Sequence, residues 1–487
     1  MVHKILDKYR NMSKPAKAAI WFVACNFIVK GISFITAPIF ARVLPTDEYG
    51  IFSVFSSYEQ IIIVLATWEI QLGAFQKGLF KFEGDEKLFS YSTQALVNFL
   101  TILFALVVAA FYKPIQQFTG MSTGIFALLF VYLLVYPSYT MWSTVKRKSY
   151  DYKPVVLTTV LFAAVNVTLP LLAVFIIQKS ANIKFIFTLI GSISICFFFY
   201  IRYCRYHKLV ANKDKVKEYW KFCIRFEGPI VLHSLSFFIL GQSDRIMVSH
   251  MVGNTEAAFY SAAGSIASVI TMFVTAINQS FTPWRYEMLK NKKYEEIRKN
   301  SNIIIIGLGV MMIAFILVVP EVLTLLFSSK YDQALACIPA LVVGTYFVFL
   351  YTIFVSIESY YEKTIYILIV SVTCSIVNIF LNYILIPIFG YAVCAYTTMV
   401  SYALFALMHH FFARKVLKPL GAEKRAIDSR FILVASISIV IVTQGIQMLY
   451  SLPFVRYGIF AAILVVCIFN RRKIIAFYKK LNEKTVD

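Results

Sequence analysis

Apolar segments of about twenty residues recur along the whole chain, and they constrain its fold more than any other feature. A hydrocarbon core of about 30 Å takes roughly 20 apolar residues per helical crossing. Only helices or closed barrels can span it, and these segments are much too long for barrel strands. Because 59% of the 487 residues are hydrophobic, a soluble domain could not bury this apolar surface. The sequence therefore predicts an all-α polytopic membrane protein.

The hydropathy pattern predicts fourteen transmembrane helices. The expected segments are 17–41, 50–72, 89–112, 122–145, 154–177, 182–201, 226–249, 256–283, 302–327, 338–361, 364–387, 391–413, 431–449 and 453–470. No cleavable signal peptide is expected, because the basic, polar N-terminal stretch is followed by an apolar run long enough to span.

Lysine and arginine are distributed unequally between the two ends of these helices. With alternating crossings, 39 lie on the side of the chain termini, 7 lie on the opposite side, and Lys30 lies inside a helix. Positive residues favour the cytoplasmic side of a membrane, so both termini are expected in the cytoplasm. The net charge of +22 then reflects topology, and no nucleic-acid partner is expected.

Two weak internal matches indicate a duplication. Residues 44–53 resemble residues 252–261, and residues 165–169 resemble residues 377–381. Together they favour two parallel six-helix pseudo-repeats around a central cavity, an arrangement suited to alternating access. The expected parts are an N-terminal six-helix lobe (1–201), a basic cytoplasmic linker (202–225), a C-terminal six-helix lobe (226–413), and two extra transmembrane helices with a basic tail (414–487).

Four stretches of the chain resemble one family of transporters. The most specific runs from Asn378 to Ala392 and continues with Ala395 and Thr397; the others are 41–50, 244–247 and 320–334. On these residues the chain resembles the polysaccharide-transporter family, the Wzx-type lipid-linked oligosaccharide flippases of the MOP (MATE-like) superfamily. The resemblance covers essentially the whole chain.

This resemblance implies a MATE-like fold and a flippase. Its cargo would be an undecaprenyl-pyrophosphate-linked oligosaccharide, such as an O-antigen or capsule unit, carried across the cytoplasmic membrane. The implied partners are this lipid-linked glycan, membrane lipids and other polysaccharide-assembly proteins.

Lys30 is the clearest candidate for contact with the cargo. It lies near the middle of the first expected helix, where an ionisable residue costs about 2.5–3.5 kcal/mol unless it is paired or hydrated. One interpretation is a cationic cavity contact for the diphosphate. The resemblance favours it, because related proteins line the cavity with cations on this helix. The other interpretation is an ion pair with a buried carboxylate.

Four further residues complete the predicted substrate-binding set. Arg245, beside Asp244 near the outer end of its helix, is expected either to contact the ligand or to brace the outer mouth through an ion pair. Gln279, Asn378 and Asn382 can hydrogen-bond sugars, although holding helices together is the simpler role.

Carboxylates within the expected helices are the candidates for coupling and gating. They are Glu59, Glu69, Asp244, Glu227 and Glu358. Glu59 and Glu69 are ten residues apart, which places them about 80° apart around an ideal helix, so both are expected to border one cavity. The alternative role is pairing with Lys30.

The sequence shows no motif for a nucleotide, a cofactor or a metal. The six histidines and eight cysteines have no metal-ligand spacing. Neither a cofactor nor a metal is therefore expected. A membrane potential or a cation gradient is the expected source of energy, at about 2.3 kcal/mol per charge per 100 mV.

Two other functions compete with the flippase. A MATE-type cation-coupled drug or metabolite antiporter shares the fold, but usually has twelve helices and an acidic cation site. A glycan polymerase or ligase usually carries a long outer loop, whereas the outer segments expected here are short. No nucleophile or acid–base constellation is visible, so the protein is not expected to be an enzyme.

Overall fold

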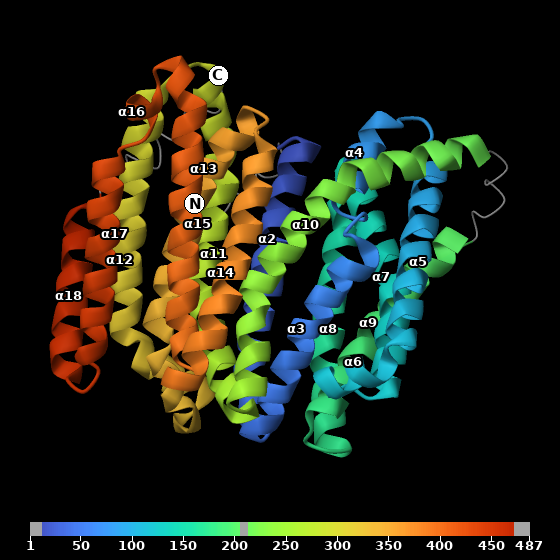
Figure 1. Ribbon diagram of the computed structural model, residues 1–487, viewed down its shortest axis with the longest axis horizontal. Coiled ribbons are helices and arrows are strands. Elements are labelled where there is room, and N and C mark those ends of the chain that lie inside the picture. Colours follow the sequence, from blue (N-terminus) through green and yellow to red (C-terminus); the bar gives the residue numbers. More distant parts are fainter. Residues whose placement is uncertain (1–11, 205–212, 472–487) are drawn as a thin grey trace. The chain divides into compact units, whose positions relative to one another are not determined.

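The computed structural model describes residues 12–204 and 213–471, and every regular element in these two ranges is helical (Figure 1). The expected all-α architecture is therefore confirmed. Residues 205–212 of the predicted cytoplasmic linker lie outside the described residues. So do residues 1–11 and most of the predicted C-terminal tail, residues 472–487.

The chain forms two compact units, Met1–Ala258 and Phe259–Asp487. The helices of the first unit are α2 (Lys14–Val43), α3 (Thr46–Thr67), α4 (Gly73–Lys81), α5 (Glu86–Ala110), α6 (Tyr112–Thr119), α7 (Thr123–Lys148), α8 (Tyr152–Ile176), α9 (Ala181–Cys204) and α10 (Lys213–Met251). The following helix, α11 (Asn254–Lys290), begins at the end of the first unit.

The second unit continues with helices of similar length. They are α12 (Tyr294–Phe327), α13 (Ile338–Tyr360), α14 (Thr364–Phe389), α15 (Val393–Leu417), α16 (Glu423–Ala426), α17 (Ser429–Met448) and α18 (Pro453–Phe469), with short 3-10 segments η2 (Ser329–Ala336) and η3 (Lys418–Leu420). Here α13 packs along α15, α14 lies against α15, and α12 packs against α17 and α18.

Twelve of the described helices are long and apolar enough to cross a membrane. The expected twelfth and fourteenth crossings correspond to α15 and α18. The 25-residue α15 is outside the set of twelve, and α18 is only 17 residues long. The protein is a multi-pass membrane protein, and the total of fourteen crossings stays a prediction.

A side-chain cap marks the start of α2, and backbone conformation marks the end of α3. Ser13 Oγ accepts a hydrogen bond from the Ala16 N–H at the start of α2, as expected of an N-cap. Trp68 and Glu69 both adopt the left-handed conformation, each with φ of 52°, so α3 ends at Thr67. Glu69 therefore lies in the turn after α3, and the expectation that it shares a helix with Glu59 is wrong.

The longest described helix, α10, has 39 residues and contains Pro229. A proline inside a helix removes a backbone hydrogen bond and bends the helix. The part before the proline, residues 213–228, is named the α10 arm here. It runs across the end of the first unit at which α4 lies, whereas the remainder of α10 runs along α3 (Figure 1).

A cluster of buried side chains joins the α10 arm to α4, α5 and α7. Its members are Ile70, Ala74, Phe75, Leu79, Phe89, Leu96, Val97, Met141, Tyr219 and Cys223. Gly78 permits this packing, because a Cβ at that position would come within 2.1 Å of the Phe89 ring. The arm is thus fixed against the first unit by a hydrophobic core of its own.

Candidate functional site

Two of the predicted residues are half-buried in neighbouring helices of the first unit. Lys30 lies on α2 and Glu59 lies on α3. Glu59 is close enough to Tyr132 and Tyr136 of α7 to interact with them electrostatically. The cargo contact of Lys30 and the coupling role of Glu59 stay predictions.

A layer of polar side chains joins α3 to α10. Gln242 Oε1 accepts hydrogen bonds from Ser57 Oγ at 3.0 Å and from Arg245 Nη1 at 2.5 Å. Gln242 Nε2 donates to Gln60 Oε1 at 3.0 Å. Asp244, the neighbouring residue in the chain, is only 1% exposed. Arg245 therefore helps to hold α10 against α3 through Gln242.

Glu227 caps the short helix α4. Its carboxylate is buried, and Oε2 accepts a hydrogen bond from the Ala74 N–H at 2.7 Å. A carboxylate at a helix N-terminus satisfies an otherwise unpaired N–H and interacts favourably with the helix dipole. A Cβ at Gly73 would lie 2.8 Å from the same carboxylate. Glu227 thus has a structural role, and its coupling role stays a prediction.

Glu69 lies in the turn between α3 and α4. Its side chain forms a hydrogen bond with Ser234 of α10, and its backbone N–H donates to Thr67 Oγ1 at 3.2 Å. These contacts join the turn to α3 and α10.

Asn378 and Asn382 are fully buried between α14 and α15. Asn382 Nδ2 donates to Asn378 Oδ1 at 3.3 Å, and Asn378 Nδ2 donates to Thr398 Oγ1 at 3.3 Å. Thr397 Oγ1 donates to Asn382 Oδ1. The two amides therefore form a continuous set of hydrogen bonds with α15, which favours helix packing over contact with sugars.

Glu358 of α13 meets His409 of α15 inside the second unit. Both side chains are fully buried, and His409 Nδ1 lies 3.0 Å from each carboxylate oxygen. Among the described residues, His409 Nε2 has no hydrogen-bond partner. The Tyr351 ring stacks on the imidazole. No sequence pattern indicates a contact between these two residues, which are 51 positions apart.

Arg285 is a buried charge that the sequence pattern assigned to a cytoplasmic loop. Instead α11 continues to Lys290, and Arg285 is 1% exposed. Its Nη2 donates to Thr282 Oγ1 at 3.1 Å and to Asn278 Oδ1 at 3.5 Å. Its Nε and Nη1 have no hydrogen-bond partner within the described part of the chain. Leaving donors of a buried cation unpaired is costly, so this guanidinium is suited to binding an anion.

Gln279, predicted to contact the cargo, lies on the same helix as Arg285. Its side chain is exposed, whereas that of the preceding residue, Asn278, is half-buried. Asn278 Oδ1 also accepts a hydrogen bond from Thr352 Oγ1 of α13 at 2.8 Å. Only Asn278 of this pair is thus tied to Arg285.

Lys184 lies near the start of the expected helix 182–201. It lies in the first turn of α9, and its side chain is 4% exposed. Its Nζ is 3.2 Å from the centroid of Phe52 and 4.0 Å from that of Phe40. Cation–π interactions of this kind stabilise a desolvated ammonium group, so Lys184 joins α9 to α2 and α3.

This all-helical, multi-pass arrangement is the MATE-like membrane-protein fold. The chain belongs to the polysaccharide biosynthesis protein family, whose model matches residues 16–289. The MatE family model matches residues 229–384. The family and the fold predicted from the sequence are therefore confirmed.

Two relatives illustrate how far the similarity extends. A Haemophilus influenzae protein, Lsg locus putative protein 1, is 24% identical over 293 residues, which cover 58% of this chain and 68% of the relative. An uncharacterised membrane protein of Methanocaldococcus jannaschii is 22% identical over 463 residues, which cover 88% of each chain.

Two solved structures share the fold. The lipid II flippase MurJ in an inward closed conformation superposes with a TM-score of 0.68 at 14% identity, covering 93% of this chain and 100% of MurJ. An inward-facing MATE multidrug resistance transporter superposes with a TM-score of 0.61 at 14% identity, covering 83% of this chain and 99% of the transporter.

Proposed function

We propose that this protein flips an undecaprenyl-pyrophosphate-linked oligosaccharide across the cytoplasmic membrane by alternating access. The family match and the MurJ-like fold support a transporter of lipid-linked glycans. The observation that carries the proposal is buried Arg285, whose Nε and Nη1 have no hydrogen-bond partner among the described residues. A diphosphate offers several acceptor oxygens, and the planar guanidinium matches phosphate in a bidentate geometry.

Further contacts in this proposal come from residues singled out in the sequence. Within the first unit, Lys30 and Arg245 are proposed as cationic contacts of the cargo, and within the second unit the exposed amide of Gln279 is proposed as a contact of the glycan. The membrane potential or a cation gradient drives the cycle, with Glu59 and Asp244 as coupling groups. The chain acts as a transporter and not as an enzyme, with both termini in the cytoplasm and other polysaccharide-assembly proteins as partners.

The proposal is tested by deleting the gene and analysing the lipid-linked glycans of the cell. We expect a lipid-linked oligosaccharide to accumulate in the cytoplasmic leaflet and the corresponding surface glycan to disappear. Expression of the wild-type protein from a plasmid should reverse both changes. A deletion strain with normal surface glycans and no accumulated lipid would refute the proposed function.

Replacement of Lys30 by alanine should abolish glycan export, because an ammonium group within the membrane is the expected partner of the diphosphate. The measurement is the amount of surface glycan in the deletion strain that expresses the variant at the wild-type level. Lys14, exposed at the start of the same helix, provides the matched control, and Lys14→Ala should export normally. Normal export by Lys30→Ala would exclude a cargo contact at this position.

A MATE-type cation-coupled antiporter is the second candidate. The MatE match and the buried Glu358–His409 pair favour it, because a titratable pair inside a unit can exchange protons. A deletion strain that becomes drug-sensitive while its surface glycans stay normal would support this function instead.

A further inference from the structure

A pocket with a positively charged lining lies between α4 and the α10 arm. Its volume is about 400 Å³, and it is lined by Lys81, Glu218, Lys221, Phe222, Arg225 and Phe226. Three of these side chains are cationic and one is a carboxylate. All six come from the first unit, and none belongs to the candidate site described above.

Aromatic rings hold lysines at the rim of this pocket. Lys81 Nζ lies 4.6 Å from the centroid of Phe222, and Lys77 Nζ lies 4.7 Å from that of Phe226. A cation–π contact orients an ammonium group and leaves its charge in place. The lysines are thereby positioned, and they still carry the charge that an anionic ligand needs.

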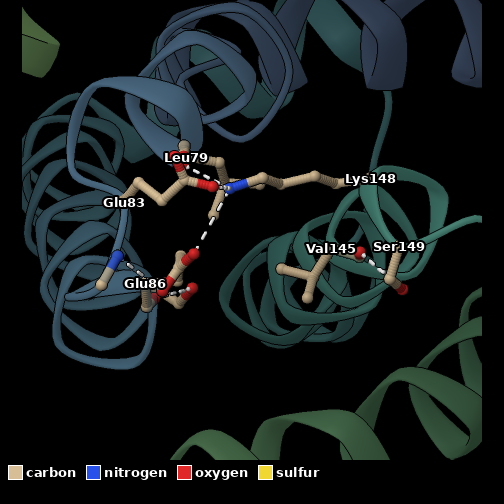
Figure 2. A network of polar contacts seen from close by, with 8 residues as sticks. Leu79, Glu83, Glu86, Val145, Lys148 and Ser149 are labelled. Atoms are coloured by element: carbon tan, nitrogen blue, oxygen red, sulfur yellow. Dashed lines mark hydrogen bonds and ion pairs between the residues drawn. The ribbon is translucent and has the colours of Figure 1, made fainter.

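The carboxylates of the neighbouring turn are engaged by other lysines. Figure 2 shows Lys148 at the end of α7, whose Nζ donates to Leu79 O at 2.8 Å and to Glu86 Oε1 at 3.3 Å, and lies 3.7 Å from Glu83 Oε1. Glu83 and Glu86 therefore neutralise the charge of Lys148, and Lys148 does not line the pocket.

Asp85 in the same turn pairs with Lys215 at the start of the α10 arm. It also accepts a hydrogen bond from the Tyr219 hydroxyl at 3.1 Å. The hydrogen bonds from Lys215 and Tyr219 hold the pKa of Asp85 below its usual range. Within the pocket lining itself, Glu218 is the carboxylate that faces three cations, so the lining has a net positive charge.

The surroundings of the pocket have the character of a membrane surface. The α10 arm runs across the end of the unit (Figure 1), and Trp220 Nε1 anchors it to Ser92 O at 2.9 Å. Next to the lining residues Lys81 and Arg225, Phe80 and Ile224 are 63% and 42% exposed. A helix with basic and apolar exposed side chains lies in the headgroup region of a bilayer. The positive charges belong to the side predicted to be cytoplasmic.

We propose that this pocket binds the phosphate of a lipid headgroup. The lysines and the arginine pair with the phosphate oxygens, and the exposed Phe80 and Ile224 contact the first carbons of the lipid chains. Two lipids carry this chemistry: an anionic phospholipid of the bilayer and the diphosphate-bearing isoprenoid carrier. The pocket acts in either case at the membrane surface, and it does not depend on the identity of the transported glycan.

The test compares lipid binding by the purified full-length protein and by a pocket variant. The variant carries Lys81→Gln, Lys221→Gln and Arg225→Gln, and the control carries Lys87→Gln, Lys153→Gln and Lys217→Gln. The control residues are exposed cations of the same unit outside the pocket lining. The wild type, the pocket variant and the control are each stripped of lipid in detergent. They are titrated separately with phosphatidylglycerol, phosphatidylcholine and undecaprenyl diphosphate, and bound lipid is counted by native mass spectrometry.

We expect the affinity of the pocket variant for phosphatidylglycerol, for undecaprenyl diphosphate or for both to fall at least about tenfold, since each surface cation contributes about 1 kcal/mol. The control should change by less than about twofold, and phosphatidylcholine should not distinguish the proteins. A loss confined to phosphatidylglycerol identifies the phospholipid as the source, and a loss confined to undecaprenyl diphosphate identifies the carrier. Equal binding of both lipids by the pocket variant and the wild type overturns the proposal.

Folding of the pocket variant is checked by its thermal unfolding midpoint. A second variant, Lys81→Arg with Lys221→Arg, retains the charges and should bind lipid as the wild type does. Failure of this charge-conserving variant to bind, with an unchanged unfolding midpoint, would also contradict a site based on charge.

Discussion

Arg285→Ala should reduce export of the lipid-linked glycan by at least about 100-fold, because two charge-assisted hydrogen bonds to the cargo contribute about 1.5–3 kcal/mol each. The guanidinium is buried, and its Nε and Nη1 have no hydrogen-bond partner in the described residues. We expect the variant protein to insert into the membrane and to accumulate at the wild-type level. The measurement is the rate at which surface glycan reappears after expression of the variant in a deletion strain.

The variant Arg285→Met separates transport from stability. Methionine keeps much of the side-chain volume but removes the buried charge, so thermal stability should stay the same or rise, while export should still be lost. Lys290→Ala, an exposed cation at the end of α11, should export normally. If Arg285→Met exports glycan normally, or if its loss of export follows a matching loss of stability, Arg285 does not bind the cargo.

Glu321→Ala should lower the free energy of unfolding by about 2–3 kcal/mol, because it leaves a buried guanidinium without its charged partner, a carboxylate that is itself 40% exposed. In the second unit Arg456 Nη2 lies 2.7 Å from Glu321 Oε1 and Nη1 lies 2.9 Å from Oε2. The Arg456 side chain is only 3% exposed, and its Nη1 also donates to Leu317 O at 2.6 Å. This bidentate pair joins α12 to α18.

The same unit offers a matched control for this prediction. Glu295 and Arg425 form an ion pair of 3.4 Å in which both side chains are more than half exposed. Glu295→Ala should therefore cost less than about 1 kcal/mol. The double variant Glu321→Ala with Arg456→Leu should recover part of the stability, because it removes the unpaired charge. The thermal unfolding midpoint in detergent is measured for each of the three variants. Equal midpoints for Glu321→Ala and Glu295→Ala would show that burial of Arg456 does not strengthen its pair.

Hydropathy predicts the membrane helices well because it is a local property of the chain. The expected segments 154–177 and 364–387 differ from α8 and α14 by at most two residues at each end. The end of α3 could not be predicted, because Trp68 and Glu69 adopt positive φ values without a glycine or asparagine to indicate them.

The charged pairs depend on how helices pack, and periodicity carries no information about that. Glu358 was recognised as an intramembrane carboxylate, but its partner His409 lies on another helix. Arg285 was assigned to a loop because the expected helix 256–283 ends two residues before it. A helix that extends beyond its apolar segment, as α11 does, can place such a residue in the protein interior.

The change of direction along α10 (Figure 1), a helix that contains Pro229, has a consequence for the bilayer. The helix after the proline contains roughly 22 residues and is about 33 Å long, close to the hydrocarbon thickness of about 30 Å. In a thinner or thicker membrane, a straight helix would adapt by tilting. Here tilting would lift the α10 arm from the surface and strain its bond from Trp220 to Ser92. We therefore expect the stability of the first unit to respond to the acyl-chain length of the surrounding lipids.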